Sequence, residues 1–227
     1  MKNVLLLIFL LFTAACTPAV FTKWQSESIS TINPADLVER YRSSLPETLN
    51  SLNSIVFDYA GIKFLGLGFI EIDRKNESFR VVCLNPMGVK LFDLSGDKKG
   101  TITNFAIEPM AKQGDIAALV AADIRRIYFD LIPASSLEPW KSEYRLLYGG
   151  GTPSGYLEHI FIGVNGDLSE KRFYTDQFIS WQVTYHDYVN TGGKRYPKGI
   201  ILTNYRDGYQ LVIREKERDL ENDKESD

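Results

Sequence analysis

Short runs of β-branched and aromatic residues, separated by turn residues, make up most of this chain of 227 residues. The run Trp181-Gln182-Val183-Thr184-Tyr185 alternates apolar with polar residues, as a strand does when one face is buried and the other is wet. Segments such as Arg206-Asp207-Gly208 supply the turns. About ten antiparallel strands are therefore predicted. They cover 55–59, 62–72, 78–84, 89–94, 145–148, 156–164, 170–175, 178–188, 196–203 and 210–214, and 101–107 is a candidate for a further strand.

One long segment in the middle of the chain has a different period. From Gln113 to Leu131 apolar residues recur at helical spacing, and Pro133 prevents the helix from continuing. Asp123, Arg125 and Arg126 are expected to point away from the apolar face of this helix. Because the helix lies between two sets of strands and does not alternate with them, we expect it to cover one face of a curved sheet or open barrel.

Two further segments flank the predicted strands. Residues 34–45 form an amphipathic helix in this prediction, with Asn33 as its cap and Pro34 in its first turn. Residues 217–227 are dense in charge and nearly without apolar side chains, which predicts a disordered tail. No linker rich in Pro, Gly or Ser divides the part between, so a single domain is expected over 35–216.

The first sixteen residues have the features of a secretory signal. Lys2 precedes an apolar run over 4–12 that is too short to span a bilayer, and small residues follow it. Ala14-Ala15-Cys16 resembles the lipobox of bacterial lipoproteins, although Thr13 stands where that motif usually has Leu. We therefore predict a signal peptide over 1–15, acylation of Cys16 and a lipidated tether over 16–34. The alternative is an ordinary signal followed by an unmodified cysteine.

Charge and cysteine content restrict the class of partner. The chain has 26 Lys and Arg against 29 Asp and Glu, a net charge of −3. It has no concentrated basic patch, so we expect no nucleic-acid partner. If Cys16 carries lipid, Cys83 is the only other cysteine and an internal disulfide is excluded. Cys83 lies in a predicted strand, where a buried structural thiol is expected in preference to a reactive one.

Four segments of this chain, in this order, resemble the LolA/LolB superfamily of periplasmic carriers and outer-membrane receptors for bacterial lipoproteins. They are Asn85-Pro86-Met87-Gly88, the helix end over 127–133, the strand over 181–185 and the run Tyr196-Pro197-Lys198-Gly199-Ile200-Ile201-Leu202. The resemblance covers about residues 50–215, although each motif is short. Because a lipobox is present, the chain is most similar to the lipid-anchored LolB-like members, uncharacterised paralogues among them.

The resemblance implies an open, strongly curved antiparallel β-barrel that is mainly β, lined with apolar side chains and covered by a helical lid. Such a barrel takes up the acyl chains of a lipoprotein or lipid. The turn of Asn85, Pro86, Met87 and Gly88 corresponds to a family loop whose exposed apolar residue helps to pass cargo to the membrane. Thr17 follows the cysteine where inner-membrane retention would show Asp, which implies the periplasmic side of the outer membrane.

The same resemblance assigns apolar residues of the strands and the helix to the cavity and its lid. The cavity-lining candidates are Phe64, Phe69, Phe79, Val81, Phe92, Trp181, Val183 and Tyr185. The lid candidates are Ile116, Leu119, Ile127 and Tyr128. Each assignment has a simpler alternative: the strand residues are an ordinary filled core, the helix is packed permanently, and Met87 is a partly buried turn residue.

No catalytic motif accompanies these features. The chain lacks the Gly-x-Ser-x-Gly, Cys-x-x-Cys and His-Glu-x-x-His patterns, so we expect no enzymatic activity and no metal. The only cofactor expected is the covalent diacylglycerol and N-acyl lipid on Cys16. We expect a monomer that meets an acyl-chain ligand, the outer membrane and a soluble LolA-like carrier. The alternative function is a non-transporting outer-membrane module for protein interaction or envelope lipid biosynthesis.

Overall fold

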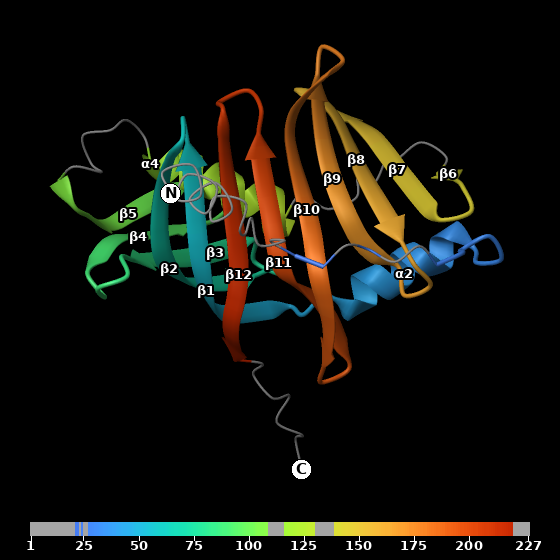
Figure 1. Cartoon of the computed structure of the whole chain (residues 1–227), viewed down its shortest axis with the longest axis horizontal. Coiled ribbons are helices and arrows are strands. Elements are labelled where there is room, and N and C mark those ends of the chain that lie inside the picture. The colour runs from blue at the N-terminus through green and yellow to red at the C-terminus, as the bar shows by residue number, and fades with distance from the viewer. Residues whose placement is uncertain (1–20, 23, 25–26, 109–115, 130–138, 220–227) are drawn as a thin grey trace, which may run out of the picture.

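The computed structural model describes residues 21–22, 24, 27–108, 116–129 and 139–219. These residues form a curved antiparallel sheet with helices on its concave side (Figure 1). The strands are β1 (Thr48–Tyr59), β2 (Ile62–Asp73), β3 (Ser78–Leu84), β4 (Lys90–Gly96), β5 (Thr101–Ala106), β6 (Trp140–Lys141), β7 (Arg145–Thr152), β8 (Gly155–Ile162), β9 (Asp167–Thr175), β10 (Phe178–Thr191), β11 (Lys194–Asn204) and β12 (Tyr209–Asp219).

The sheet has twelve strands in the order β5-β4-β3-β2-β1-β12-β11-β10-β9-β8-β7-β6. The first and last strands pair in its middle, where Tyr59 lies opposite Tyr209, and each half is a run of hairpins. β5 and β6 are the two free edges, so the barrel is open. The mainly β, strongly curved fold predicted from the sequence is confirmed, with two strands more than the ten expected.

Helix α2 (Pro34–Ser44) begins where the sequence predicts. The Asn33 carboxamide oxygen accepts a hydrogen bond from the Ala35 N–H at 3.0 Å and so satisfies a donor at the helix start. Its apolar face, which includes Tyr41, is buried, and the Tyr41 ring meets the edge of Phe161 on β8 at 5.3 Å. The predicted amphipathic helix is confirmed, and it fixes one end of the second half of the sheet.

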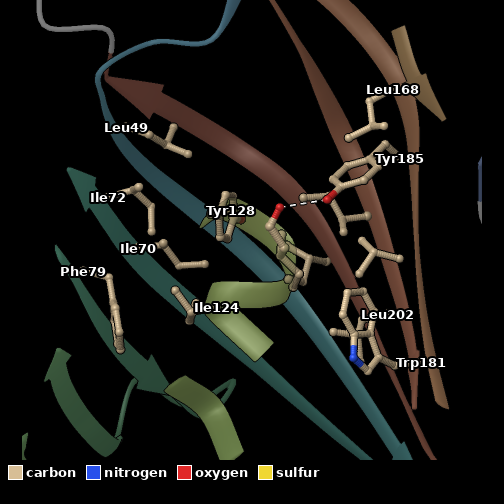
Figure 2. Close-up of a cluster of buried hydrophobic side chains, with 14 of the residues drawn as sticks. Leu49, Ile70, Ile72, Phe79, Ile124, Tyr128, Leu168, Trp181, Tyr185 and Leu202 are labelled. Atoms are coloured by element: carbon tan, nitrogen blue, oxygen red, sulfur yellow. Dashed lines mark hydrogen bonds between the residues drawn. The ribbon is translucent and has the colours of Figure 1, made fainter. Parts of the chain in front are cut away.

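The central helix has two parts. It starts as α4 (Ile116–Ile124) and continues as a π-helical turn, η1 (Arg125–Phe129), which lies across the concave face (Figures 1 and 2). The ends of the predicted helix, residues 113–115 and 130–131, lie outside the described residues. The core lies between this helix, α2 and the two halves of the sheet.

The described part of the predicted tether packs against the domain. Ile29 is fully buried, and its N–H donates to the Glu143 carbonyl at 2.7 Å. The Lys141 ammonium donates to the carbonyls of Ser30 and Ile32 at 2.8 and 2.7 Å. From residue 27 onward, therefore, this segment is attached to the sheet by backbone contacts and by burial.

The predicted ends of the chain are only partly described. The signal peptide and Cys16 lie outside the described residues, as do residues 220–227 of the predicted tail. The first three residues of that tail belong to β12, which continues to Asp219, so the tail prediction starts too early. None of the described helices is both long and apolar enough to cross a membrane.

Candidate functional site

The concave face of the sheet is an apolar wall contributed by both halves. Alternation along each strand points every second side chain inward, so β3 and β10 present their apolar residues to the same space. Six of the predicted lining residues are buried on this wall: Phe79, Val81, Phe92, Trp181, Val183 and Tyr185. The structure thus brings together residues from strands that are about a hundred positions apart in the sequence (Figure 2).

The two predicted lining residues of β2 lie on opposite faces. Phe64 points inward and packs, half-buried, against the core. Phe69 is an odd number of residues from Phe64 along β2, and successive side chains of a strand alternate between its two faces. Its side chain therefore points outward, where 45% of it is exposed. The assignment of Phe69 to the cavity is therefore corrected. The inward positions near it are Gly66 and Gly68, and Ile55 of β1 fills the space beside Gly68.

The helix candidates differ in how deeply they pack. Ile127 and Tyr128 of η1 are buried against the wall, whereas Ile116 and Leu119 of α4 are half-buried. Burial raises the pKa of Tyr128 to about 12, which keeps its hydroxyl neutral. The tight contact is thus concentrated in η1, and the start of α4 covers the wall less completely.

The carbonyls of η1 are held by side chains that rise from the sheet. A helix end has carbonyls without a partner in the helix, and here the sheet supplies the donors. The Tyr185 hydroxyl donates to the Ile127 carbonyl at 2.8 Å (Figure 2). The Lys171 ammonium, on a side chain that is 1% exposed, lies 3.1 Å from the Arg126 carbonyl and 3.3 Å from that of Ile127. We call these contacts the η1 latch.

A second polar contact holds the end of α4. The Tyr209 hydroxyl of β12 lies 2.8 Å from both carboxylate oxygens of Asp123, and the Arg126 guanidinium donates to the same carboxylate at 2.7 Å. Burial raises the pKa of Asp123, and the hydrogen bond from Tyr209 acts in the opposite direction. Asp123 is buried, so the expectation that it points away from the apolar face is wrong. The reason is that β12 places a donor beneath it.

Of the residues that hold the helix, only Lys171 carries a signal in the sequence. It occupies an inward position of an alternating strand, between Ser169 and Phe173, where a lysine needs acceptors. No local pattern marks Tyr209 or Tyr185 as partners of the helix, because each is distant from it in sequence. These contacts are visible only once the register of β9, β10 and β12 is known.

Little space remains between the helix and the wall. A cavity of about 40 Å³ lies among α2, η1 and β10–β12. Ligand pockets usually measure about 300–1,000 Å³, so this one holds about one water molecule and no acyl chain. It is lined by Tyr41, Leu45, Ser51, Asn53, Tyr128, Tyr185, Tyr188, Arg195, Pro197, Lys198, Ile200, Ile213, Glu215 and Arg218. The cavity beneath this part of the helix is therefore closed to a ligand of that size.

A larger hollow of about 740 Å³ opens at the edge half of the sheet, over the ends of β1–β5. Its lining includes Glu71, Asp73, Arg80 and Lys99 beside only a few apolar side chains such as Phe79. Charged walls of this kind do not favour an acyl chain over water. We therefore do not assign the acyl chain to this groove.

The turn between β3 and β4 displays its apolar residue to solvent. The Asn85 side-chain oxygen accepts hydrogen bonds from the N–H groups of Met87 at 3.0 Å and Val89 at 2.9 Å, which fixes the turn. Gly88 has a φ of +81°, a conformation that glycine adopts without strain. Met87 is 84% exposed at the tip.

Solved structures of other proteins share this architecture. A LolA superfamily protein from Nitrosomonas europaea is 13% identical, with a TM-score of 0.58 over 84% of this chain and 94% of that one. A putative outer membrane lipoprotein-sorting protein domain from Vibrio parahaemolyticus is 11% identical, with a TM-score of 0.54 over 86% and 96%. A DUF1329 family protein from Desulfovibrio piger is 10% identical, with a TM-score of 0.55 over 84% and 92%. This chain has the LolA fold.

No family sequence model and no curated protein sequence matches the chain. The likeness is therefore one of structure, and it confirms at the level of the fold the resemblance seen in the sequence motifs. In the LolA fold of this chain, the concave wall and the helix that covers it form the candidate site. Within the described residues this site combines apolar and aromatic side chains with the η1 latch and the buried Asp123 contact.

Proposed function

We propose that this protein is a lipoprotein of the outer membrane, facing the periplasm, that binds acyl chains of a lipoprotein or lipid and passes them to the membrane. The observation that carries the proposal is a helix that covers an apolar wall and is attached to it by a few side-chain hydrogen bonds. The wall supplies the binding surface and the helix supplies the lid. The LolA fold and the exposed Met87 turn support the same function.

The lid has to move before a chain can bind, because the cavity measures only about 40 Å³. Each latch hydrogen bond contributes about 0.5–1.5 kcal/mol, and about 1.5–3 kcal/mol where the donor is charged. A chain that buries about twelve CH₂ groups gains roughly 10 kcal/mol. Opening also separates Ile127 and Tyr128 from the wall, so a bound acyl chain has to replace their apolar contacts as well as the latch, while the empty protein stays closed and hides its apolar wall from water.

Such a carrier needs no chemical step. Acyl chains leave water for the apolar wall, and they move on when a bilayer or another site binds them better. Handover therefore follows affinity alone, and we propose a binding protein without enzymatic activity or metal. The only lipid bound covalently would be the acyl chains of Cys16.

The proposed location and partners rest on the sequence and on the structural neighbours. Ala15-Cys16-Thr17 is the expected acylation point, and Thr17 favours the outer membrane. One neighbour is described as a putative outer membrane lipoprotein-sorting protein domain. We propose that a soluble LolA-like carrier delivers the ligand to a monomer of this protein.

The Tyr185→Phe variant tests the lid. It removes one latch hydrogen bond worth about 1 kcal/mol and so destabilises the closed state. The apparent affinity for a fluorescent fatty acid should then rise roughly fivefold. Tyr188→Phe is the matched control: the Tyr188 hydroxyl, also on β10, donates at 2.9 Å to the Leu168 carbonyl of β9 and not to the lid. Equal apparent affinities of the two variants for the fatty acid would contradict a lid held by the latch.

The closed interior also favours a second candidate, a non-transporting envelope module with a permanently filled core. In such a protein the latch is part of the fold, and weakening it lowers stability without creating a binding site. Uptake by neither the native protein nor Tyr185→Phe, at fatty-acid concentrations up to the solubility limit, would support the second candidate and overturn the first.

A further inference from the structure

An aromatic residue upstream of the domain is seated on the outer face of the sheet. The Phe21 ring stacks on the His186 ring with centroids 5.0 Å apart and planes 10° apart, and the Arg214 guanidinium lies 4.8 Å from the ring centre. Beneath the ring is Gly199, and any side chain there would overlap Phe21. The Thr22 N–H donates to the Asp187 carboxylate at 3.2 Å. We call the site formed by His186, Gly199 and Arg214 the Phe21 seat.

The seat lies in the middle of the sheet and on its convex side. His186, Gly199 and Arg214 are neighbours across β10, β11 and β12, in one cross-strand row. His186 follows Tyr185, which points inward to η1, so His186 points outward. Phe21 therefore attaches the N-terminal segment to the face opposite the candidate binding wall.

We propose that the Phe21 seat holds the lipid anchor against the convex face, so that this face of the protein lies on the bilayer. This inference rests on the acylation of Cys16 in the proposed function. Cys16 precedes Phe21 by five residues. Five residues span at most about 17 Å even when fully extended. The glycerol of the anchor, and with it the membrane surface, is thus kept close to the seat.

An apolar patch lies beside the seat on the same face. Arg214 pairs with Ser54, and Ser54 with Leu67, so Leu67 is two strands, or about 10 Å, from the seat. Its outward neighbours on β2, Leu65 and Phe69, are 55% and 45% exposed. The outward row that runs along β2 is thus apolar at each of these three positions, and no described segment covers the two exposed ones.

The patch continues to the Met87 turn. Leu67 pairs with Leu84 at the end of β3, and the turn that carries Met87 begins at the next residue. The Met87 turn therefore lies beside the Leu65 end of this row, and we call the exposed apolar side chains at positions 65, 69 and 87 the membrane face. A bilayer is the occupant because the anchor holds lipid within reach of this surface. Orientation by the seat would bring the Met87 turn to the membrane at the moment of handover.

The test uses the full, acylated chain in phosphatidylethanolamine–phosphatidylglycerol vesicles that contain spin-labelled lipid. In a Cys83→Ser background, single cysteines replace Leu65, Phe69 or Tyr144 and carry a fluorophore. Tyr144, in the β6–β7 turn, is 43% exposed and so matches Phe69 in exposure, but it lies at the far edge of the sheet. We expect severalfold stronger quenching at 65 and 69 than at 144.

Two variants then separate the seat from the anchor. Phe21→Ala removes the ring, and Gly199→Val fills the seat with a residue that strands accept readily. Both should lose the selective quenching at 65 and 69 while the membrane-bound fraction stays unchanged. Equal quenching at all three positions, or selective quenching that survives both variants, would overturn the proposal.

Failure of the inference can be distinguished from failure of the proposed function by mass. Intact-protein mass spectrometry of the same preparation reports the acyl chains on Cys16. A mass without acyl chains would refute the lipid anchor itself and, with it, the role of the seat. An acylated protein without selective quenching would refute only the orientation, and the proposed carrier function would stand.

Discussion

At the scale of single residues, the carboxylate of Asp93 links three strands in the first half of the sheet. Asp93 on β4 is buried, and it accepts hydrogen bonds from the Arg80 guanidinium at 2.9 and 3.2 Å and from the Asn104 amide at 3.2 Å. The hydrogen bond from Arg80 lowers the pKa of Asp93 to about 2, more than burial raises it. The group joins β3, β4 and the edge strand β5, so its ionisation state affects all three.

The Asp93→Asn variant should therefore change how stability depends on pH. The pKa is 3.8 unfolded and about 2 folded, so the contribution of Asp93 is complete above pH 4 and is lost as the pH falls from 3.8 to 2. The Asp93→Asn variant has no carboxylate at this position, so its stability should not fall in this pH range through protonation of residue 93. Urea unfolding at pH 5 and pH 2.5 measures it, with Asp58→Asn as the control, because the Asp58–Lys63 ion pair is more exposed than the Asp93 contact. A pH dependence of the Asp93 variant as steep as that of the native protein would contradict the assignment.

At the scale of elements, α2 is fixed to the sheet by a close approach of two backbones. Gly166 in the β8–β9 turn has a φ of +73°, and a Cβ on it would lie 2.6 Å from the Leu37 carbonyl oxygen of α2. A backbone atom cannot move aside as the end of a side chain can. This contact explains why glycine is required in that turn, for its conformation and for its size.

Gly166→Ala should destabilise the protein by about 1–3 kcal/mol beyond the strain of the backbone, because α2 has to move. Gly193→Ala in the β10–β11 turn is the matched control: its φ of +72° imposes the same strain, but a Cβ on it would meet no atom within 4 Å. Thermal or urea unfolding of the two variants gives the difference. Equal destabilisation would show that α2 does not press on this turn.

How far the sequence predicts an element depends on how its apolar residues are spaced. On β10 apolar residues alternate strictly from Trp181 to Tyr185, so Trp181, Val183 and Tyr185 can be assigned to one face. On β2 nearly every residue from Ile62 to Ile72 is apolar or glycine, and no period of two separates the faces. The assignment of Phe69 to the cavity fails for that reason.

The candidate site is predictable in outline and not in its polar contacts. The helical spacing around Ile127 and the resemblance to carriers indicate a covering helix. Its attachment depends on Lys171 and Tyr209, which approach it only through the register of distant strands. Burial of Asp123 against β12 likewise follows from that register, because a charged residue on an isolated helix is expected to face water.

At the scale of the whole molecule, the proposed binding wall and the proposed membrane face lie on opposite sides of one sheet. The concave side carries the wall and the lid, and the convex side carries the Phe21 seat and the exposed apolar residues. A chain leaving the wall has to pass an open end of the barrel to reach the bilayer. The Met87 turn is at the end of β3, where the two sides meet.

Met87→Glu should impair transfer of a bound fatty acid to vesicles severalfold while leaving uptake and folding intact, because a charge at an 84% exposed tip opposes contact with the bilayer. Val164→Glu is the control, since Val164 is exposed in the β8–β9 turn at the other end of the strands. Stopped-flow fluorescence measures the transfer rate. Unchanged transfer by Met87→Glu would remove the turn from the handover step.

The central claim is that acyl chains bind between the lid and the concave wall. Native mass spectrometry of the Cys16→Ala protein, isolated from the periplasm as a soluble form, tests it most directly. The account predicts a bound acyl lipid whose mass identifies the cargo, or uptake of an added fatty acid that increases in Tyr185→Phe. A protein that stays empty in both forms, with lipid present in excess, would contradict it.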